Sequence, residues 1–224
     1  MFTFKTTRYA LLCLLVAIVS RPASSERDGP QVEFVLGAEQ ITANCGDCMG
    51  ATEAALLDGV RKVEHAIAKG YQDLNSALKA LAEGYRTYQY VWAKPASADA
   101  VAARSKRTSI YAELVKLSPT DASVRYEYAE LLDTPKEQIQ QLRIALSVNA
   151  LHGLVPYRLG LLLVEQGSTK EGVAMLLAAI DMSPDQANAK RYAARAEELL
   201  SGRAAREELN QIRRGLNRRL QKQN

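Results

Sequence analysis

The chain has 224 residues, a formal net charge of +4 and 47% hydrophobic residues, with only 13 glycines and 7 prolines. This length suits one domain or one domain with an appendage, and the abundance of alanine, leucine, glutamate, lysine and arginine favours an all-α protein. Residues 203–224 hold seven basic and two acidic side chains, whereas residues 26–202 hold 19 basic and 23 acidic ones. The body therefore lacks the positive field of a nucleic-acid-binding protein, and we expect no nucleic-acid partner.

The first 25 residues have the features of a secretory signal peptide. Lys5 and Arg8 precede an apolar run at residues 10–19, and small residues at 23–25 provide a cleavage site. The run is shorter than the roughly 20 residues that span a bilayer, so we expect cleavage, with an uncleaved membrane anchor as the alternative. The chain contains no Asn-x-Ser/Thr sequon that would indicate a glycosylating route. We therefore expect a periplasmic or secreted protein of the bacterial cell envelope.

Residues 26–50 are expected to form an irregular segment that ends in a turn-rich loop. Val32, Phe34 and Leu36 recur at every second position. This spacing is typical of a short strand, or of an extended arm that lies along the helices.

The loop contains Cys45-Gly46-Asp47-Cys48, which has four interpretations. A c-type haem site needs a histidine after the second cysteine, where Met49 stands. A thioredoxin-like redox site belongs at a helix start beside a βαβ pattern, and a zinc or copper site needs further ligands. In an oxidising compartment we expect a structural disulfide between Cys45 and Cys48. The redox and metal interpretations stay open as alternatives, and we expect no cofactor.

Residues 51–95 are predicted to form a helical hairpin. Thr52 is a suitable N-cap, and apolar residues recur at helical spacing between positions 56 and 67. A second periodic run extends to position 92 and is ended by Pro95. A further helix is predicted from about Ser97 to position 117, because Ser97 suits an N-cap.

Two capping patterns predict helix boundaries farther along the chain. Thr134-Pro135-Lys136-Glu137 combines an N-cap threonine, a proline at the first helical position and a glutamate that closes a capping box. Ser168-Thr169-Lys170-Glu171 repeats the pattern. Around these caps, residues 139–148 and 154–164 are long and apolar enough for packed helices.

A repeat pattern links these helices. Pro119 and Pro184 each follow an apolar run and a serine, and they lie 65 residues apart, about two repeats of 34 residues. Residues 96–202 resemble the tetratricopeptide repeat family. In the better-matched repeat, the family's conserved small and apolar positions are occupied by Leu159-Gly160, Gly172, Leu176 and Ala179. In the earlier repeat they are occupied by Tyr128-Ala129, Leu142 and Ala145, and Ala150 replaces the closing proline.

This resemblance implies a right-handed α-solenoid of antiparallel helix pairs, in which small residues let paired helices approach closely. It also implies a groove lined by the first helix of each pair, which binds a protein or peptide partner. On this alignment the residues that project towards the groove are Tyr126, Glu130, Tyr157, Leu161, Arg191 and Arg195. The alternative is that the tyrosines only pack between repeats.

The basic segment at residues 203–224 is predicted to form a C-terminal helix. Leu209, Ile212, Leu216 and Leu220 recur on one face, and Gly215 weakens the helix. We expect this helix to cap the last repeat by covering its exposed apolar face. The alternative is docking on an anionic surface, either a membrane or a partner.

No catalytic constellation is present in the sequence. The two histidines, His65 and His152, are far apart, and the chain has neither a Gly-x-Ser-x-Gly motif nor a phosphate-binding glycine loop. We therefore expect a non-enzymatic interaction scaffold or assembly factor. The alternative is a thiol-disulfide or copper- or zinc-handling accessory protein that acts through Cys45 and Cys48.

Overall fold

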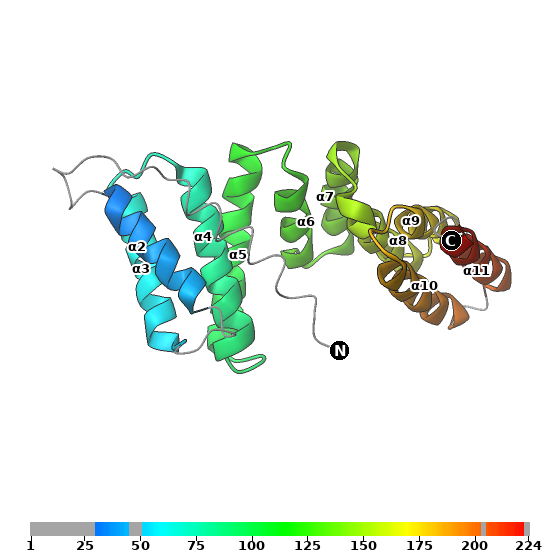
Figure 1. The fold of residues 1–224 in the computed structure, drawn as a ribbon, viewed down its shortest axis with the longest axis horizontal. Coiled ribbons are helices and arrows are strands. Elements are labelled where there is room, and N and C mark those ends of the chain that lie inside the picture. Colours follow the sequence, from blue (N-terminus) through cyan, green and yellow to red (C-terminus); the bar gives the residue numbers. More distant parts are fainter. Residues whose placement is uncertain (1–29, 45–50, 203–204, 222–224) are drawn as a thin grey trace. The chain divides into compact units, whose positions relative to one another are not determined.

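The computed structural model describes residues 30–44, 51–202 and 205–221, and these residues form ten α-helices and no strand (Figure 1). The fold class is all-α, as the composition predicted. The chain divides after Leu114 into two compact units.

The first unit consists of helices that pack on their neighbours along the chain. It comprises α2 (Pro30–Ala43), α3 (Glu53–Ala68), α4 (Leu74–Thr87), the π-helical turn η1 (Tyr88–Trp92) and most of α5 (Ala98–Leu117). α2 packs on α3 and also touches α4, and α3 packs on α4 (Figure 1).

The expectation of an irregular arm or strand is wrong for residues 30–43, which form α2. Glycines allow this helix to lie unusually close to α3. A Cβ atom on Gly37 would lie 2.8 Å from the carbonyl oxygen of Gly59, and one on Gly59 would lie 2.9 Å from that of Gly37. Phe34 also stacks on Tyr71, with ring centroids 4.3 Å apart. The predicted hairpin at residues 51–95 is therefore packed against a third helix, α2.

The other predictions for the first unit are confirmed at the level of helix boundaries. The Ala55 amide donates to the Thr52 hydroxyl at 3.2 Å, so Thr52 is the N-cap of α3. The Ala100 amide donates to the Ser97 hydroxyl at 3.2 Å, at the start of α5. The second run ends before Pro95, where α4 passes into η1.

The second unit contains helices that pack in consecutive pairs. α6 packs on α7, α8 on α9 and α10 on α11, and α9 also contacts both α10 and α11. The elements are α6 (Ala122–Leu131), α7 (Pro135–Val148), the 3-10 turn η2 (Leu151–Gly153), α8 (Leu154–Glu165), α9 (Thr169–Asp181), α10 (Gln186–Ser201) and α11 (Arg206–Gln221).

Thr134 caps α7 as predicted, but the Glu137 carboxylate bonds to the Thr134 hydroxyl, whereas in a capping box it bonds to the backbone amide. The Glu137 amide donates to the Thr134 hydroxyl at 3.3 Å, and that hydroxyl donates to the Glu137 carboxylate at 2.6 Å. Ser168 precedes α9 as predicted, but its side chain makes no capping hydrogen bond. The second prediction is therefore correct for the boundary and wrong for the bond.

The pair α8 and α9 is held by the small and apolar residues that carried the repeat pattern. A Cβ atom on Gly160 would lie 2.8 Å from the carbonyl oxygen of Gly172, and one on Gly172 would lie 2.8 Å from that of Gly160. Leu176 and Ala179 are completely buried. The close approach of α8 and α9 thus depends on the lack of a side chain at Gly160 and Gly172.

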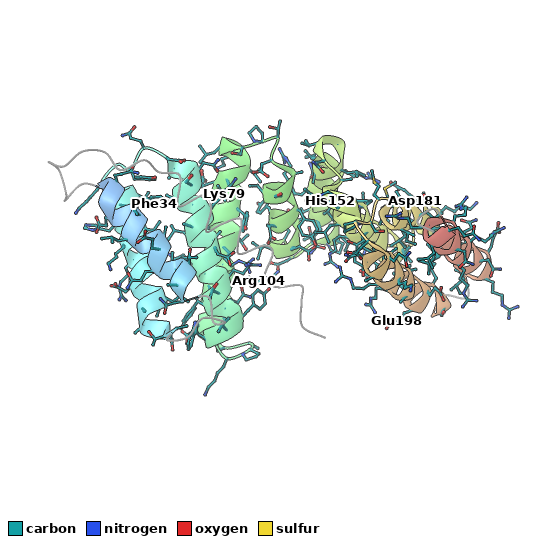
Figure 2. All side chains as sticks on the ribbon, viewed as in Figure 1. Phe34, Lys79, Arg104, His152, Asp181 and Glu198 are labelled. Atoms are coloured by element: carbon teal, nitrogen blue, oxygen red, sulfur yellow. The ribbon has the colours of Figure 1, made fainter. Side chains whose placement is uncertain are left out.

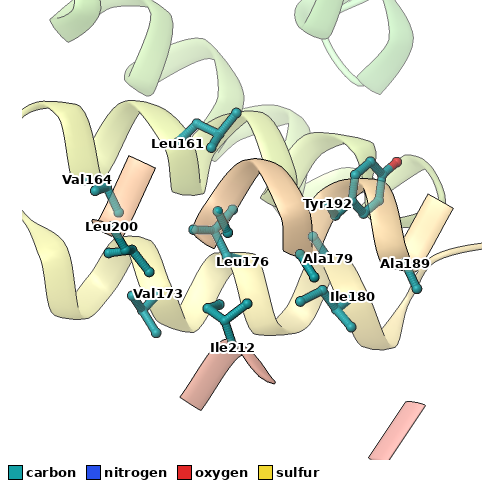
Figure 3. Close-up of a cluster of buried hydrophobic side chains, with 12 residues drawn as sticks. Leu161, Val164, Val173, Leu176, Ala179, Ile180, Ala189, Tyr192, Leu200 and Ile212 are labelled. Atoms are coloured by element: carbon teal, nitrogen blue, oxygen red, sulfur yellow. The ribbon is translucent and has the colours of Figure 1, made fainter. Parts of the chain in front are cut away.

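The largest core cluster of this unit joins α8, α9, α10 and α11 (Figure 3). Ile212 on α11 is fully buried in this cluster beside residues of α9 and α10, and Leu209 and Leu216 pack against it. Gly215, which costs helix stability, lies directly over α9, because a Cβ atom there would lie 2.5 Å from Leu177 Cδ2. Glycine therefore lets α11 cover the apolar faces of α9 and α10.

Candidate interaction surface

The six residues predicted to line a groove lie on the first helix of each consecutive pair in the second unit. Two lie on each of α6, α8 and α10, which start after Asp121, Gly153 and Asp185 respectively. In the structure Tyr157 and Arg191 both contact Tyr192, and Glu130 is paired with Arg158 on α8. Leu161 is buried.

A tyrosine stack joins α8 to α10. The rings of Tyr157 and Tyr192 lie 4.3 Å apart at an interplanar angle of 20°, and the guanidinium of Arg191 lies 5.5 Å from the centre of the Tyr192 ring. Tyr192 is only 3% exposed, whereas Tyr157 is half-buried. Such ring and cation–π contacts give the surface a rigid aromatic centre.

Tyr126 on α6 is partly buried and packs against a core cluster shared by α6, α7 and α8. Burial raises the pKa of its hydroxyl, the nearby carboxylates of Glu130 and Glu127 raise it further, and Arg158 acts in the opposite direction. Arg158 on α8 donates to the Glu130 carboxylate on α6 at 2.5 Å, which ties the two first helices together. At neutral pH the tyrosine hydroxyl is therefore an uncharged hydrogen-bonding group.

The two predicted arginines of α10 are exposed and make only local contacts. Arg191 donates to the Asn188 side chain at 2.8 Å, and Arg195 donates to the Glu198 carboxylate at 2.6 Å. Glu198 is labelled on α10 in Figure 2. Burial raises the pKa of the Tyr157 hydroxyl, and the positive charges of Arg191 and Arg195 make that rise smaller. They are thus beside the stack and accessible to a ligand.

Leu161 does not share this accessibility. It is 6% exposed and belongs to the core cluster with Val164 and Leu176 (Figure 3). The alignment placed it towards a groove, but in this structure it packs between helices. Its contribution is to the stability of the unit.

Two residues of the surface were missed by the sequence argument. Tyr192 and Arg158 are as well connected as the predicted residues. A signal for Tyr192 was present, because it follows Tyr157 by 35 residues, close to the repeat length that the prolines suggested. Arg158 carried no signal, since a lone arginine on a helix is most often a solvated residue.

The cysteine and histidine predictions have different outcomes. Cys45 and Cys48 lie outside the described residues. On either side of them, the Thr52 amide donates to the Asn44 side chain at 2.8 Å, which joins the end of α2 to the start of α3. His65 is exposed as expected and contacts Glu33 on α2. His152 lies in η2 with a left-handed φ of 54°.

The described residues contain no group of three or more histidine, cysteine, aspartate or glutamate side chains placed to hold a metal ion. Among the same residues, no helix combines the length and hydrophobicity needed to cross a membrane. No protein-family model matches the sequence, and no curated protein matches it either.

Proposed function

We propose that the protein is a non-catalytic interaction scaffold of tetratricopeptide-like helix pairs, exported to the bacterial cell envelope. In this proposal the pairs form a right-handed solenoid, and α6, α8 and α10 present their faces to a protein or peptide partner. Residues 1–25 are a cleaved signal peptide.

The packing of paired helices supports the repeat part of the proposal. The pair α8 and α9 crosses at two glycines, and the family resemblance assigns small residues to those positions for close approach. The pair α2 and α3 crosses at Gly37 and Gly59 in the same reciprocal manner. We therefore include α2 and α3 in the proposal as a repeat-like pair of the first unit. The segment that connects these two helices contains Cys45 and Cys48.

The observation that carries the binding proposal is the row of tyrosines and charges on α6, α8 and α10. Tyr126 and Tyr157 are partly exposed rings with polar ends, and the buried Tyr192 supports Tyr157 by stacking on it. Arg191 and Arg195 are exposed on α10. Aromatic and arginine side chains are enriched at the energetic centres of interfaces. A row of this kind suits an amphipathic helix or an extended peptide that carries both apolar and acidic residues.

The experiment is a capture assay from envelope extract with the protein from Glu26 onward. The test variant is Arg191→Ser/Arg195→Ser, because both side chains are exposed and their loss leaves the core intact. The control is Arg61→Ser/Lys106→Ser, which removes the same charge from exposed positions in the first unit. We expect one partner to be captured by the wild type and the control and to be lost by the test variant.

A Tyr126→Ala/Tyr157→Ala variant gives a stronger test of the row, provided that far-UV circular dichroism shows unchanged helicity. Equal capture by all variants would exclude this face as the binding surface. A Cys45→Ser/Cys48→Ser variant separates the alternative function. A scaffold keeps its partner without the cysteines, whereas a thiol- or metal-handling protein loses its activity.

A further inference from the structure

The arginines of α11 fall into two groups. Arg213 donates to the Glu197 carboxylate of α10 at 3.1 Å, and Arg219 donates to the Ser183 carbonyl oxygen at 2.8 Å, so both tie α11 to the body. Arg214 and Arg218 are exposed. Within the described residues Arg214 donates only to the carbonyl of Asn210 in its own helix, and Arg218 makes no ion pair.

These two arginines lie together at the edge of a depression between α9 and α11. They are four residues apart and therefore share one face of the helix. The depression has a volume of about 490 Å³ and is lined by Leu177, Gln211, Arg214, Asn217, Arg218 and Gln221. It contains one apolar side chain, three amides and two guanidinium groups, and no carboxylate among its lining residues.

This composition recognises an anion rather than an apolar ligand. Two like charges on one helix face repel, and a carboxylate bound between them replaces that repulsion with attraction. Guanidinium groups bind carboxylates through paired hydrogen bonds. The amides can donate to and accept from a peptide backbone, and Leu177 offers contact to one apolar side chain.

We propose that this α9–α11 depression is a second docking site, and that its occupant is an acidic peptide segment of a partner protein, with an apolar residue flanked by carboxylates. The site shares no residue with the tyrosine row on α6, α8 and α10. Together with the surface proposed above, on which this statement rests, the second unit would hold two contact surfaces for two partner segments.

A membrane surface fits the same features less well. Three of the four apolar residues of α11 belong to the core: Ile212 is completely buried, and Leu209 and Leu216 pack against the same cluster. Leu220 alone is left as an apolar anchor. Two arginines with so small an anchor give weak and salt-sensitive adsorption to a lipid surface.

The test is a fluorescence anisotropy titration of the full chain with a labelled Gly-Glu-Glu-Leu-Glu-Glu-Gly peptide. A second peptide, in which glutamine replaces each glutamate, measures the dependence on charge. The test variant is Arg214→Gln/Arg218→Gln. The control variant, Arg61→Gln/Lys106→Gln, has the same net charge and an unchanged depression.

We expect saturable binding of the acidic peptide, and a loss of affinity of about tenfold or more in the test variant, because each arginine supplies charge-assisted hydrogen bonds. The control variant should bind as the wild type does, and the glutamine peptide should not bind. If the test variant loses helicity, Arg218→Gln alone replaces it, since that side chain holds no ion pair within the described residues.

Three outcomes would overturn the proposal. The first is equal affinity of the test and control variants for the acidic peptide. The second is binding of the glutamine peptide as tightly as the acidic one. The third is binding to vesicles of phosphatidylglycerol and phosphatidylcholine that depends on Arg214 and Arg218, with no binding of the peptide, which would assign the site to an anionic lipid surface.

Discussion

The crossing of α8 and α9 gives the most demanding test of how this chain folds. Gly160 and Gly172 face each other, and each would place a Cβ atom 2.8 Å from the carbonyl oxygen of the other. Alanine normally stabilises a helix relative to glycine by about 1 kcal/mol, through the lower entropy of the unfolded chain. At Gly160 the new methyl group meets backbone atoms that cannot rotate away, so the two helices must move apart.

The magnitude follows from these opposing terms. Overpacking of a close-packed contact costs about 1–3 kcal/mol, and the gain in helix propensity offsets about 1 kcal/mol of it. The backbone contact places Gly160→Ala in the upper part of the range, so we expect a net destabilisation of about 1–2 kcal/mol. For a unit of this size, that change lowers the melting temperature by roughly 4–10 °C.

The assay is thermal and urea unfolding followed by far-UV circular dichroism, with Gly202→Ala as the matched control. Gly202 has a helical φ of −66°, and the nearest atom to a Cβ there is 3.8 Å away. The same substitution should therefore stabilise the protein at Gly202, by about 0.4–1 kcal/mol. Opposite signs at the two positions are the expected result.

A double variant tests whether one crossing accounts for both glycines. If a single separation of α8 and α9 accommodates both methyl groups, Gly160→Ala/Gly172→Ala costs less than the sum of the two single variants, by at least about 0.5 kcal/mol. Additive costs, or a stabilising Gly160→Ala, would refute the close crossing and the reasoning built on it.

Three further predictions test other contacts. Ile212→Ala should destabilise the second unit by about 2–5 kcal/mol in urea unfolding, because it removes a fully buried side chain of α11 from the core; a loss below about 1 kcal/mol would show that α11 is not part of that core. Thr134→Ala should cost about 1 kcal/mol and Ser168→Ala close to none, because only Thr134 makes a capping hydrogen bond, and equal costs in the same assay would contradict this. The Glu33 carboxylate has a pKa below its ordinary value of 4.5, chiefly through its hydrogen bond with His65. The ionised carboxylate therefore stabilises the folded protein above pH 4.5, and this stabilisation is lost as the pH falls through the lowered pKa. Unfolding midpoints measured from neutral pH to about pH 3 should therefore fall less in Glu33→Gln than in the wild type, and parallel curves would argue against this contact.

Local patterns in the sequence predicted the helical elements well from Thr52 onward. Caps such as Thr52 and Thr134 act within one turn of the chain, so their effect is visible without tertiary information. The segment at 30–43 was misjudged for the opposite reason. Its apolar residues alternate, its helix carries no strong amphipathic pattern, and it is stabilised by the crossing of Gly37 with Gly59, which are 22 positions apart.

The residues of the candidate surface also differ in whether the sequence could predict their positions. The spacing of the repeat placed Tyr126, Tyr157 and Arg191 on the first helices of successive pairs, and in the structure Tyr157 and Arg191 both contact Tyr192. Spacing gave no means to distinguish Leu161, which lies in the core, from the half-buried Tyr157 on the same helix, because adjacent helices bury residues on more than one face. It also gave no indication of Arg158, whose ion pair with Glu130 exists only after α6 and α8 have packed.

The sequence by itself determined the all-α class and the helix starts after its caps, because each depends on neighbours within a few residues. Only the tertiary structure decided that α2 joins the hairpin, that Gly215 fits α11 against Leu177, and that Arg214 and Arg218 stand without acidic partners within the described residues. These outcomes depend on contacts between segments far apart in the chain. Such contacts form when apolar faces find complementary partners, and this choice is not encoded in any single stretch of residues.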